Sequence, residues 1–195
     1  MNPRRMPEKS LLVVAAFSRH PDALEWAARR LIETYGPIAM TSADYPFHHT
    51  AYYDQEMGPG LVKRLMVFDG LRPSDILPDV KNHAILLEAE YAREANLPEP
   101  RPLNLDPGLL QLGKFLLATT KDQGHRVYLR DNIYAEVTLR FQFDQFEPWP
   151  WTYADYREPF VREFLASARG HLRALTQQER RAGATTTESP TENHP

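Results

Sequence analysis

Strict alternation of apolar and polar residues marks the stretch that begins at Ile133. Such a period of two is typical of a half-buried β-strand. A shorter alternating stretch precedes it, in which Val127 and Leu129 stand between polar neighbours. The two stretches predict a β-hairpin. The residues that share the apolar face of the longer strand are Ile133, Ala135, Val137, Leu139, Phe141 and Phe143.

The apolar face also predicts the length of the hairpin loop. A two-residue loop would place apolar residues of one strand opposite polar residues of the other. A three-residue loop over 130–132 keeps one face apolar and puts Asn132 where a left-handed residue is needed. The expected cross-strand pairs are Leu129 with Ile133, Val127 with Ala135, Tyr128 with Tyr134, and Arg126 with Glu136.

The remaining elements follow from hydrophobic period and from proline and glycine signals. Strands are expected at residues 11–17, 38–41, 61–69 and 103–105. Helices are expected at residues 21–35, from Pro73-Ser74-Asp75 to about 95 with an interruption at Pro78, at 109–119, and at about 156–175.

The helix expected over 109–119 is apolar nearly all round, which is typical of a deeply buried helix. Asp106 stands at the N-cap position, and Pro107 would be the first helical residue. A polar turn over 119–124 would connect this helix to the hairpin.

This order of elements predicts an α+β fold with a mixed or antiparallel sheet. The first six elements fit a ferredoxin-like unit, which the C-terminal hairpin and final helix would extend. We expect a mobile N-terminus at residues 1–9, a single domain at 10–176 and a disordered tail at 177–195.

Composition narrows the function classes. A net charge of -3 argues against a nucleic-acid binder, and zero cysteines exclude disulfides and thiolate metal sites. The longest apolar run, Leu11 to Phe17, is too short to span a membrane. We therefore expect a cytoplasmic protein with no nucleic-acid or membrane partner.

Several ordered motifs resemble a prokaryotic domain-of-unknown-function family, number 4416, over about residues 11–175. Members are sometimes labelled GTP-binding proteins, and the resemblance implies no established activity. The motifs are YPF (45–47), YYDQEMG (52–58), NLDPG (104–108), ATTKD (118–122), HRVYL (125–129), IYAEVTL (133–139) and PWTYADYR (150–157).

An ordinary GTPase is not expected from these residues. The chain has no glycine-rich loop ending in Gly-Lys-Ser/Thr, which P-loop proteins use to hold phosphates. Lys121 and Asp122 resemble the guanine-binding motif of GTPases, in which one residue separates the lysine from the aspartate. Here the two residues are adjacent.

The best candidate site combines polar residues of the expected turn and hairpin. Glu136 or His125 would act as acid or base, and Lys121 and Arg126 would hold an anionic group. The simpler reading is that Arg126 and Glu136 form a cross-strand pair and that Lys121 is solvated. In this reading Asp106 is a helix cap, and for Asp106 it is the reading that we favour. The ligand-binding candidates are Lys121, Asp122, Arg126, Tyr128, Tyr134 and Asp106.

Two other groups favour structural roles. His48 and His49, with Asp44, Asp54 and Glu56, offer metal-binding atoms, but adjacent residues of an extended chain point oppositely, so no metal site is predicted. The aromatic residues more often complete a core or an interface than stack a base. They are Tyr45, Phe47, Tyr52, Tyr53, Trp149, Trp151, Tyr153 and Tyr156.

Two functions remain open from the sequence. The first is a protein that binds a small anionic molecule, such as a nucleotide; as an enzyme it would perform phosphoryl or nucleotidyl chemistry assisted by a divalent metal ion. The second is a non-catalytic interaction or homo-oligomerisation module that uses the tyrosine-rich loop at 44–60 and the aromatic strap at 146–156.

Overall fold

The computed structural model describes residues 8–47 and 53–185. The helices are α1 (Pro21–Tyr35), α2 (Asp54–Met57), α3 (Leu77–Ala95) and α4 (Pro159–Thr185), with 3-10 turns η2 (Ser74–Ile76) and η3 (Ala154–Arg157). The strands are β1 (Leu11–Ser18), β2 (Ile38–Thr41), β3 (Tyr45–Pro46), β4 (Val62–Phe68), β5 (Asn104–Leu110), β6 (Lys114–Thr119), β7 (Val127–Arg130), β8 (Ile133–Gln142) and β9 (Gln145–Pro148).

These strands form one antiparallel sheet in the order β2-β4-β1-β5-β6-β8-β7, with β3 beside β4 and β9 beside β8. The expected α+β class is confirmed, and of the two sheet types left open the antiparallel one is present. The elements β1, α1, β2, β4, α3 and β5 follow one another in the expected strand–helix–strand, strand–helix–strand order. Assignment of this unit to the ferredoxin-like class stays a prediction.

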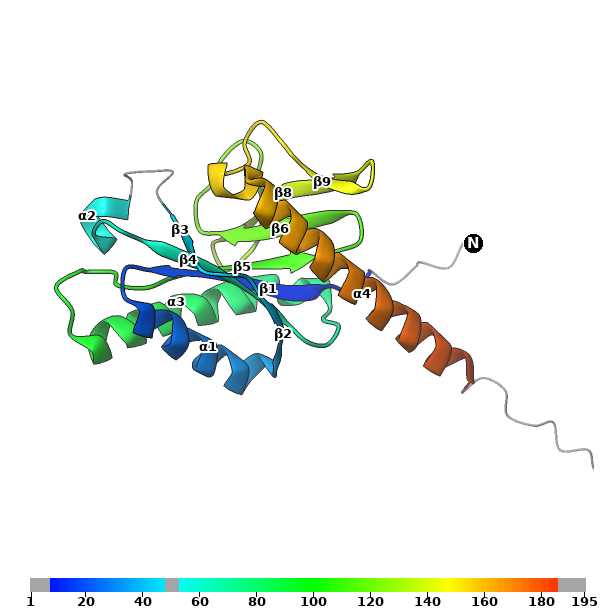
Figure 1. The fold of residues 1–195 in the computed structure, drawn as a ribbon, viewed down its shortest axis with the longest axis horizontal. Helices are drawn as coiled ribbons and strands as arrows, with labels where there is room; N and C mark the ends of the chain where they lie inside the picture. The colour runs from blue at the N-terminus through cyan, green and yellow to red at the C-terminus, as the bar shows by residue number, and fades with distance from the viewer. Residues whose placement is uncertain (1–7, 48–52, 186–195) are drawn as a thin grey trace, which may run out of the picture.

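Helices cover both faces of the central sheet, with α1 and α3 on one side and α4 on the other (Figure 1). Strand β1 shows why its sequence is a continuous apolar run: Leu12, Val14 and Ala16 pack in the cluster of α1 and α3. The alternate residues Leu11, Val13 and Ala15 pack against α4. A central strand covered on both faces needs apolar residues at every position.

The expected helix over 109–119 is wrong, because this segment forms the end of β5, a turn and β6. A short run that is apolar on all sides fits a strand buried on both faces as well as a buried helix. Asp106 is consequently a strand residue opposite Ala15 and not a helix cap. Gly108 fits the sheet because a Cβ atom there would lie 2.3 Å from the carbonyl oxygen of Leu116.

The β7–β8 hairpin is present, but its loop differs from the expected one. Val127 pairs with Ala135 and Tyr128 with Tyr134, as predicted, whereas Arg130 pairs with Ile133 across an irregularity in register. The loop is therefore two residues long, and the extra residue sits in a bulge. Both loop residues have positive φ, 54° at Asp131 and 59° at Asn132, as a tight hairpin turn with matching twist requires.

Strand β8 is expected to have a single apolar face, but its apolar residues lie on both faces of the sheet. Ile133 and Ala135 pack in the cluster of α1 and α3, whereas Leu139 and Phe141 pack with α4. A register shift against β6, near Val137, reverses the side-chain alternation between these positions. Phe143 lies in the β8–β9 turn with φ 50° and is largely exposed.

The short elements β3, α2 and β9 were not expected from the sequence. The other helices and strands begin near their expected residues, with Pro78 in the first turn of α3. A disordered tail is expected from residue 177, but α4 continues to Thr185. Residues 186–195 and most of the expected mobile N-terminus lie outside the described residues.

Candidate functional site

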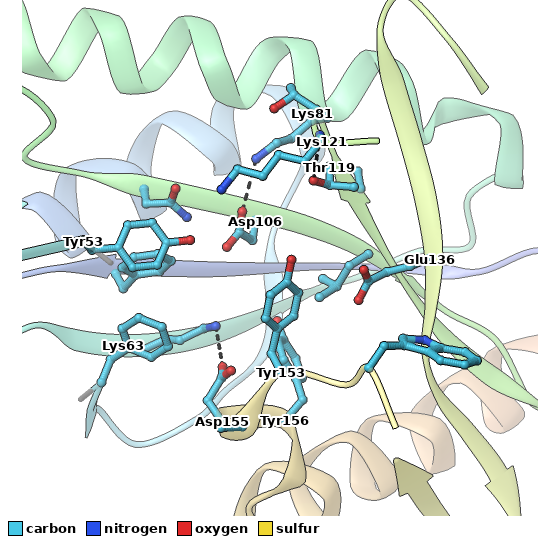
Figure 2. Close-up of a pocket in the computed structure, with 18 of the residues that line it drawn as sticks. Tyr53, Lys63, Lys81, Asp106, Thr119, Lys121, Glu136, Tyr153, Asp155 and Tyr156 are labelled. Atoms are coloured by element: carbon cyan, nitrogen blue, oxygen red, sulfur yellow. Dashed lines mark hydrogen bonds and ion pairs between the residues drawn. The ribbon is translucent and has the colours of Figure 1, made fainter. Parts of the chain in front are cut away.

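The candidate site is a cavity of about 460 Å³ on the sheet face that α4 covers, beside the start of that helix. It forms where β5 and β6 part. These strands pair only at residues 108–110 with 115–117, so the first half of β5 has β1 as its neighbour on one side and the cavity on the other. Figure 2 shows Lys81 and Lys121 reaching toward Asp106, with Lys63 and Asp155 across the cavity.

Side chains of α3 provide hydrogen-bond partners for the backbone of β5 along the edge that does not pair with β6. The N–H of Leu105 donates to Glu88 Oε1 at 2.8 Å, and the carbonyl of Leu105 accepts from Lys81 Nζ at 2.8 Å. Because buried peptide groups need partners, these contacts stabilise the part of β5 that does not pair with β6. Burial raises the pKa of Glu88, although Lys81 and Arg101 oppose that effect.

Lys63 lies in one wall of the cavity and is 2% exposed. Its ammonium donates to Asp155 Oδ2 at 2.6 Å. It also lies 4.6 to 5.3 Å from the ring centres of Tyr156, Phe47 and Phe17. The carboxylate and the ring faces together offset the cost of removing the ammonium from water.

Lys81 provides the second buried ammonium, and the residue is 5% exposed. Besides the Leu105 carbonyl it contacts Asp106 Oδ1 at 3.2 Å. Burial opposes ionisation of Asp106, but the positive charges of Lys81, Lys63 and Arg101 outweigh it and hold the pKa of Asp106 below its usual value. The carboxylate is therefore ionised at neutral pH.

Arg126 connects three parts of the cavity wall. Its guanidinium donates to Glu136 Oε2 at 2.9 Å, to the carbonyl of Lys121 at 2.9 Å and to the hydroxyl of Tyr153 at 2.7 Å. The expected Arg126–Glu136 contact is present. It fixes β8, the β6–β7 loop and the aromatic strap at 146–156 relative to one another.

Glu136 is buried and both of its oxygens have partners. Oε2 contacts His125 Nε2 at 3.2 Å in addition to Arg126, and Oε1 accepts from the hydroxyl of Thr138 at 3.2 Å. This arrangement orients His125 and Arg126.

Positive charge exceeds negative charge around the cavity. Five cationic side chains line it against three carboxylates, Asp106, Glu136 and Asp155. Outside the lining, Glu88 and Glu56 pair with Arg101 at 3.0 and 3.8 Å, so the excess of positive charge holds for the lining residues themselves. The cationic residues in the lining are Lys63, Lys81, Arg101, Lys121 and Arg126.

The candidate residues divide into two groups. Asp106, Lys121, Arg126 and Glu136 all line the cavity, so residues of β5, the β6–β7 loop and β8 meet there. The other four lie outside the lining. His125 stacks on Trp151 with ring centres 5.2 Å apart, Tyr128 meets Tyr134 edge to face at 5.4 Å, and Asp122 is exposed.

Sequence reasoning missed several polar residues of the cavity lining, among them the buried Lys63, Lys81, Asn104 and Asp155 and the partly exposed Arg101. A signal was present at Lys63, which alternates with Leu61, Leu65 and Val67 on one face of an expected strand. Lys81 likewise follows Leu77 at helical spacing on the apolar side of α3. A lysine on an apolar face indicates a buried partner.

Several of the aromatic residues singled out in the sequence line the cavity rather than a separate interface. They are Phe47, Tyr53, Trp151, Tyr153 and Tyr156. Tyr45 packs edge to face on Phe160, and Trp149 stacks on Trp151 at 5.1 Å. Tyr52 lies outside the described residues.

No group of three or more potential metal ligands occurs in the part of the chain that the structure describes. Of the metal-binding atoms considered from the sequence, both carboxylate oxygens of Asp44 accept from Arg64, at 2.6 and 2.9 Å. His48 and His49 lie outside the described residues.

Fold and site together define an antiparallel α+β protein whose sheet parts into a cationic, aromatic-edged cavity. The chain belongs to a family described as a domain of unknown function (DUF4416), whose model matches residues 8–171. No curated protein matches the chain. Within residues 8–47 and 53–185, every helix is too short or too polar to cross a bilayer.

Proposed function

We propose that this protein binds a small anionic organic molecule in the cavity between β5 and β6. The observation that carries the proposal is the excess of cationic over acidic side chains around a cavity of about 460 Å³. This volume lies within the range of small-molecule sites, about 300 to 1,000 Å³. A positive cavity that contains two buried lysines is stabilised when an anion enters it.

The walls favour a ligand that also has a planar or apolar part. Phe17, Phe47, Tyr53 and Trp151 line the cavity beside the charged groups. Aromatic walls combined with cationic ends fit nucleotides and other ring-bearing phosphates or carboxylates. A nucleotide is therefore the first class of compound to test.

The test is a thermal-shift screen against nucleotides, sugar phosphates and organic acids at constant ionic strength. A ligand that binds only the folded state adds about 2.7 kcal/mol of stability at one hundred times its dissociation constant. Trp151 lies in the lining, so its fluorescence provides a second readout. If no compound raises the melting temperature or changes the fluorescence, the proposal is wrong.

Two exposed lysines near β6 provide a matched pair of variants. Lys121 lines the cavity, whereas Lys114, at the start of β6, does not. Lys121→Glu should weaken binding at least about tenfold, since it replaces an attractive charge by a repulsive one. Lys114→Glu makes the same change in total charge and should stay within about twofold of wild type.

An interaction module based on the aromatic strap is the alternative. The strap's polar groups are directed inward: Trp151 Nε1 donates to the carbonyl of Val137 at 3.1 Å, and the Tyr153 hydroxyl accepts from Arg126. These contacts hold the strap against β8 and the cavity. We therefore rank the interaction module below ligand binding.

A further inference from the structure

Asn104 has a buried amide nitrogen with no hydrogen-bond partner among the described residues. The residue is 1% exposed and lines the cavity. Its amide orientation is fixed by Arg101, whose guanidinium donates to Asn104 Oδ1. An arginine has no acceptor, so the atom facing it must be the oxygen, and Nδ2 carries the two free N–H donors.

Such a group is costly unless something binds it. Leaving a buried donor without a partner costs about 1 to 3 kcal/mol. The backbone conformation also gives the side chain little choice, because Asn104 pairs with Phe17 in the sheet and must point to the cavity face. A ligand acceptor at this position would recover the lost hydrogen bond.

Lys81 and Arg101 lie beside this amide. Arg101 contacts Asn104 directly, and Lys81 binds the carbonyl of Leu105, the next residue of β5. Described contacts of the Lys81 ammonium use two of its three donors, at Leu105 and Asp106. Donors of three side chains therefore gather along the open edge of β5, where no strand competes for them.

We infer that Asn104, Lys81 and Arg101 form the subsite that receives the ligand's oxyanion, a phosphate or a carboxylate. This inference rests on the proposed function and adds the position and chemistry of the anionic group. It moves that group away from Arg126, whose three guanidinium nitrogens donate to Glu136, Lys121 and Tyr153. Arg101 pairs with Glu88 through Nε and Nη2, but its Nη1 lies 3.8 Å from Glu56 Oε2, beyond hydrogen-bond distance. Lys121, in the β6–β7 loop, also reaches toward Asp106 and adds positive charge to the same cavity (Figure 2).

A second unpartnered group faces the same space. The hydroxyl of Tyr156 is buried without a partner among the described residues, and Tyr156 also lines the cavity. Phenol hydroxyls donate as well as accept. Tyr156 is therefore assigned to a polar atom of the ligand other than the oxyanion, on the side of the cavity near Lys63.

Asn104→Asp is the sharpest test of the subsite. It keeps an oxygen for Arg101 and replaces the donor Nδ2 by a charged oxygen of the same size. Inorganic phosphate and oxalate serve as probes for the two oxyanions, titrated separately by tryptophan fluorescence at constant ionic strength. We expect Asn104→Asp to weaken binding at least about tenfold, because the lost hydrogen bond is one to a charged group.

Asn82→Asp on α3 is the matched control, since it makes the same chemical change outside the lining. It should stay within about twofold of wild type. Asn104→Ala, which removes the donor without adding charge, keeps the test valid if the aspartate variant fails to fold. Loss with phosphate alone assigns a phosphate ligand, and loss with oxalate alone assigns a carboxylate.

Different failures have different meanings. If wild type binds a probe and the Asn104 variants bind it equally well, the subsite is wrong and the proposed function stands. If wild type binds neither probe and no compound of the wider screen, the proposed function fails and the subsite fails with it.

Discussion

Lys63 and Lys81 are buried in opposite walls of one cavity, and each ammonium is paired with an aspartate. A buried charge is tolerated only when it is paired and hydrogen-bonded. Removal of one partner therefore leaves the other charge uncompensated in a poorly solvated place. At the scale of single residues, stability and the candidate function depend on the same groups.

Asp106→Asn should make this dependence visible through pH. The pKa of Asp106 is lowered in the folded protein, so its ionised form contributes stability above the usual aspartate pKa, about 3.9, and loses it as pH falls through the lowered pKa. The variant should be less stable than wild type by about 1 to 3 kcal/mol near pH 7. Urea unfolding at a series of pH values measures the difference.

The difference between wild type and variant should begin to shrink below about pH 4, where Asp106 of the unfolded chain takes up a proton, and should be smallest once the pH has fallen through the lowered pKa of the folded protein. A difference that stays constant from neutral to acid pH would contradict the assigned ion pair.

Strands β5 and β6 determine where the cavity opens. Residues 109–119 could not be recognised as strand from periodicity, because both faces of this part of the sheet are covered and the segment is nearly uniformly apolar. By contrast, the amphipathic patterns of α1 and α4, which each bury one stripe, were sufficient to predict those helices. The Val127–Ala135 and Tyr128–Tyr134 pairs of β7 and β8 were predicted because that register aligns the apolar residues, whereas the bulge that pairs Arg130 with Ile133 was not.

Gly108→Ala should test the close approach of β5 and β6. The added methyl would lie 2.3 Å from the Leu116 carbonyl oxygen and 2.7 Å from the Phe115 ring, so the strands must shift. We expect a loss of about 1 to 3 kcal/mol in the free energy of unfolding.

Gly113→Ala, in the turn that follows β5, is the control for this change. A Cβ there meets no atom within 4 Å, and the variant should lie within about 0.5 kcal/mol of wild type. Equal effects of the two substitutions in denaturant titrations would rule out the packing argument.

At the scale of the whole molecule, α4 covers one face of the sheet with its first two-thirds and extends past the sheet at its C-terminal end (Figure 1). Val161, Leu165, Ala168 and Leu172 are buried against the strands. From residue 177 to residue 182 the helix is exposed. The packed part anchors the strap and hence one wall of the cavity.

Truncation after Gln177 should therefore leave the melting temperature within about 2 °C of wild type. The described contacts that it removes include the exposed Lys9–Glu179 ion pair, and such pairs contribute under about 1 kcal/mol. Differential scanning calorimetry of the shortened chain measures this. A larger fall in melting temperature would show that the end of α4 has a structural partner.

The sequence by itself determined the α+β class, the helices with one buried stripe and two cross-strand pairs of the β7–β8 hairpin, because these depend on local period and on chain neighbours. It also placed Glu136, Arg126 and Lys121 in one site, since they lie on a single hairpin and its preceding turn. Only the tertiary structure decided that residues 109–119 form the end of β5, a turn and β6. It also brought Lys63, Lys81 and Asn104 to the same cavity from β4, α3 and β5. Contacts between elements distant in the chain follow from how the two sheet faces are covered, and no local pattern records that.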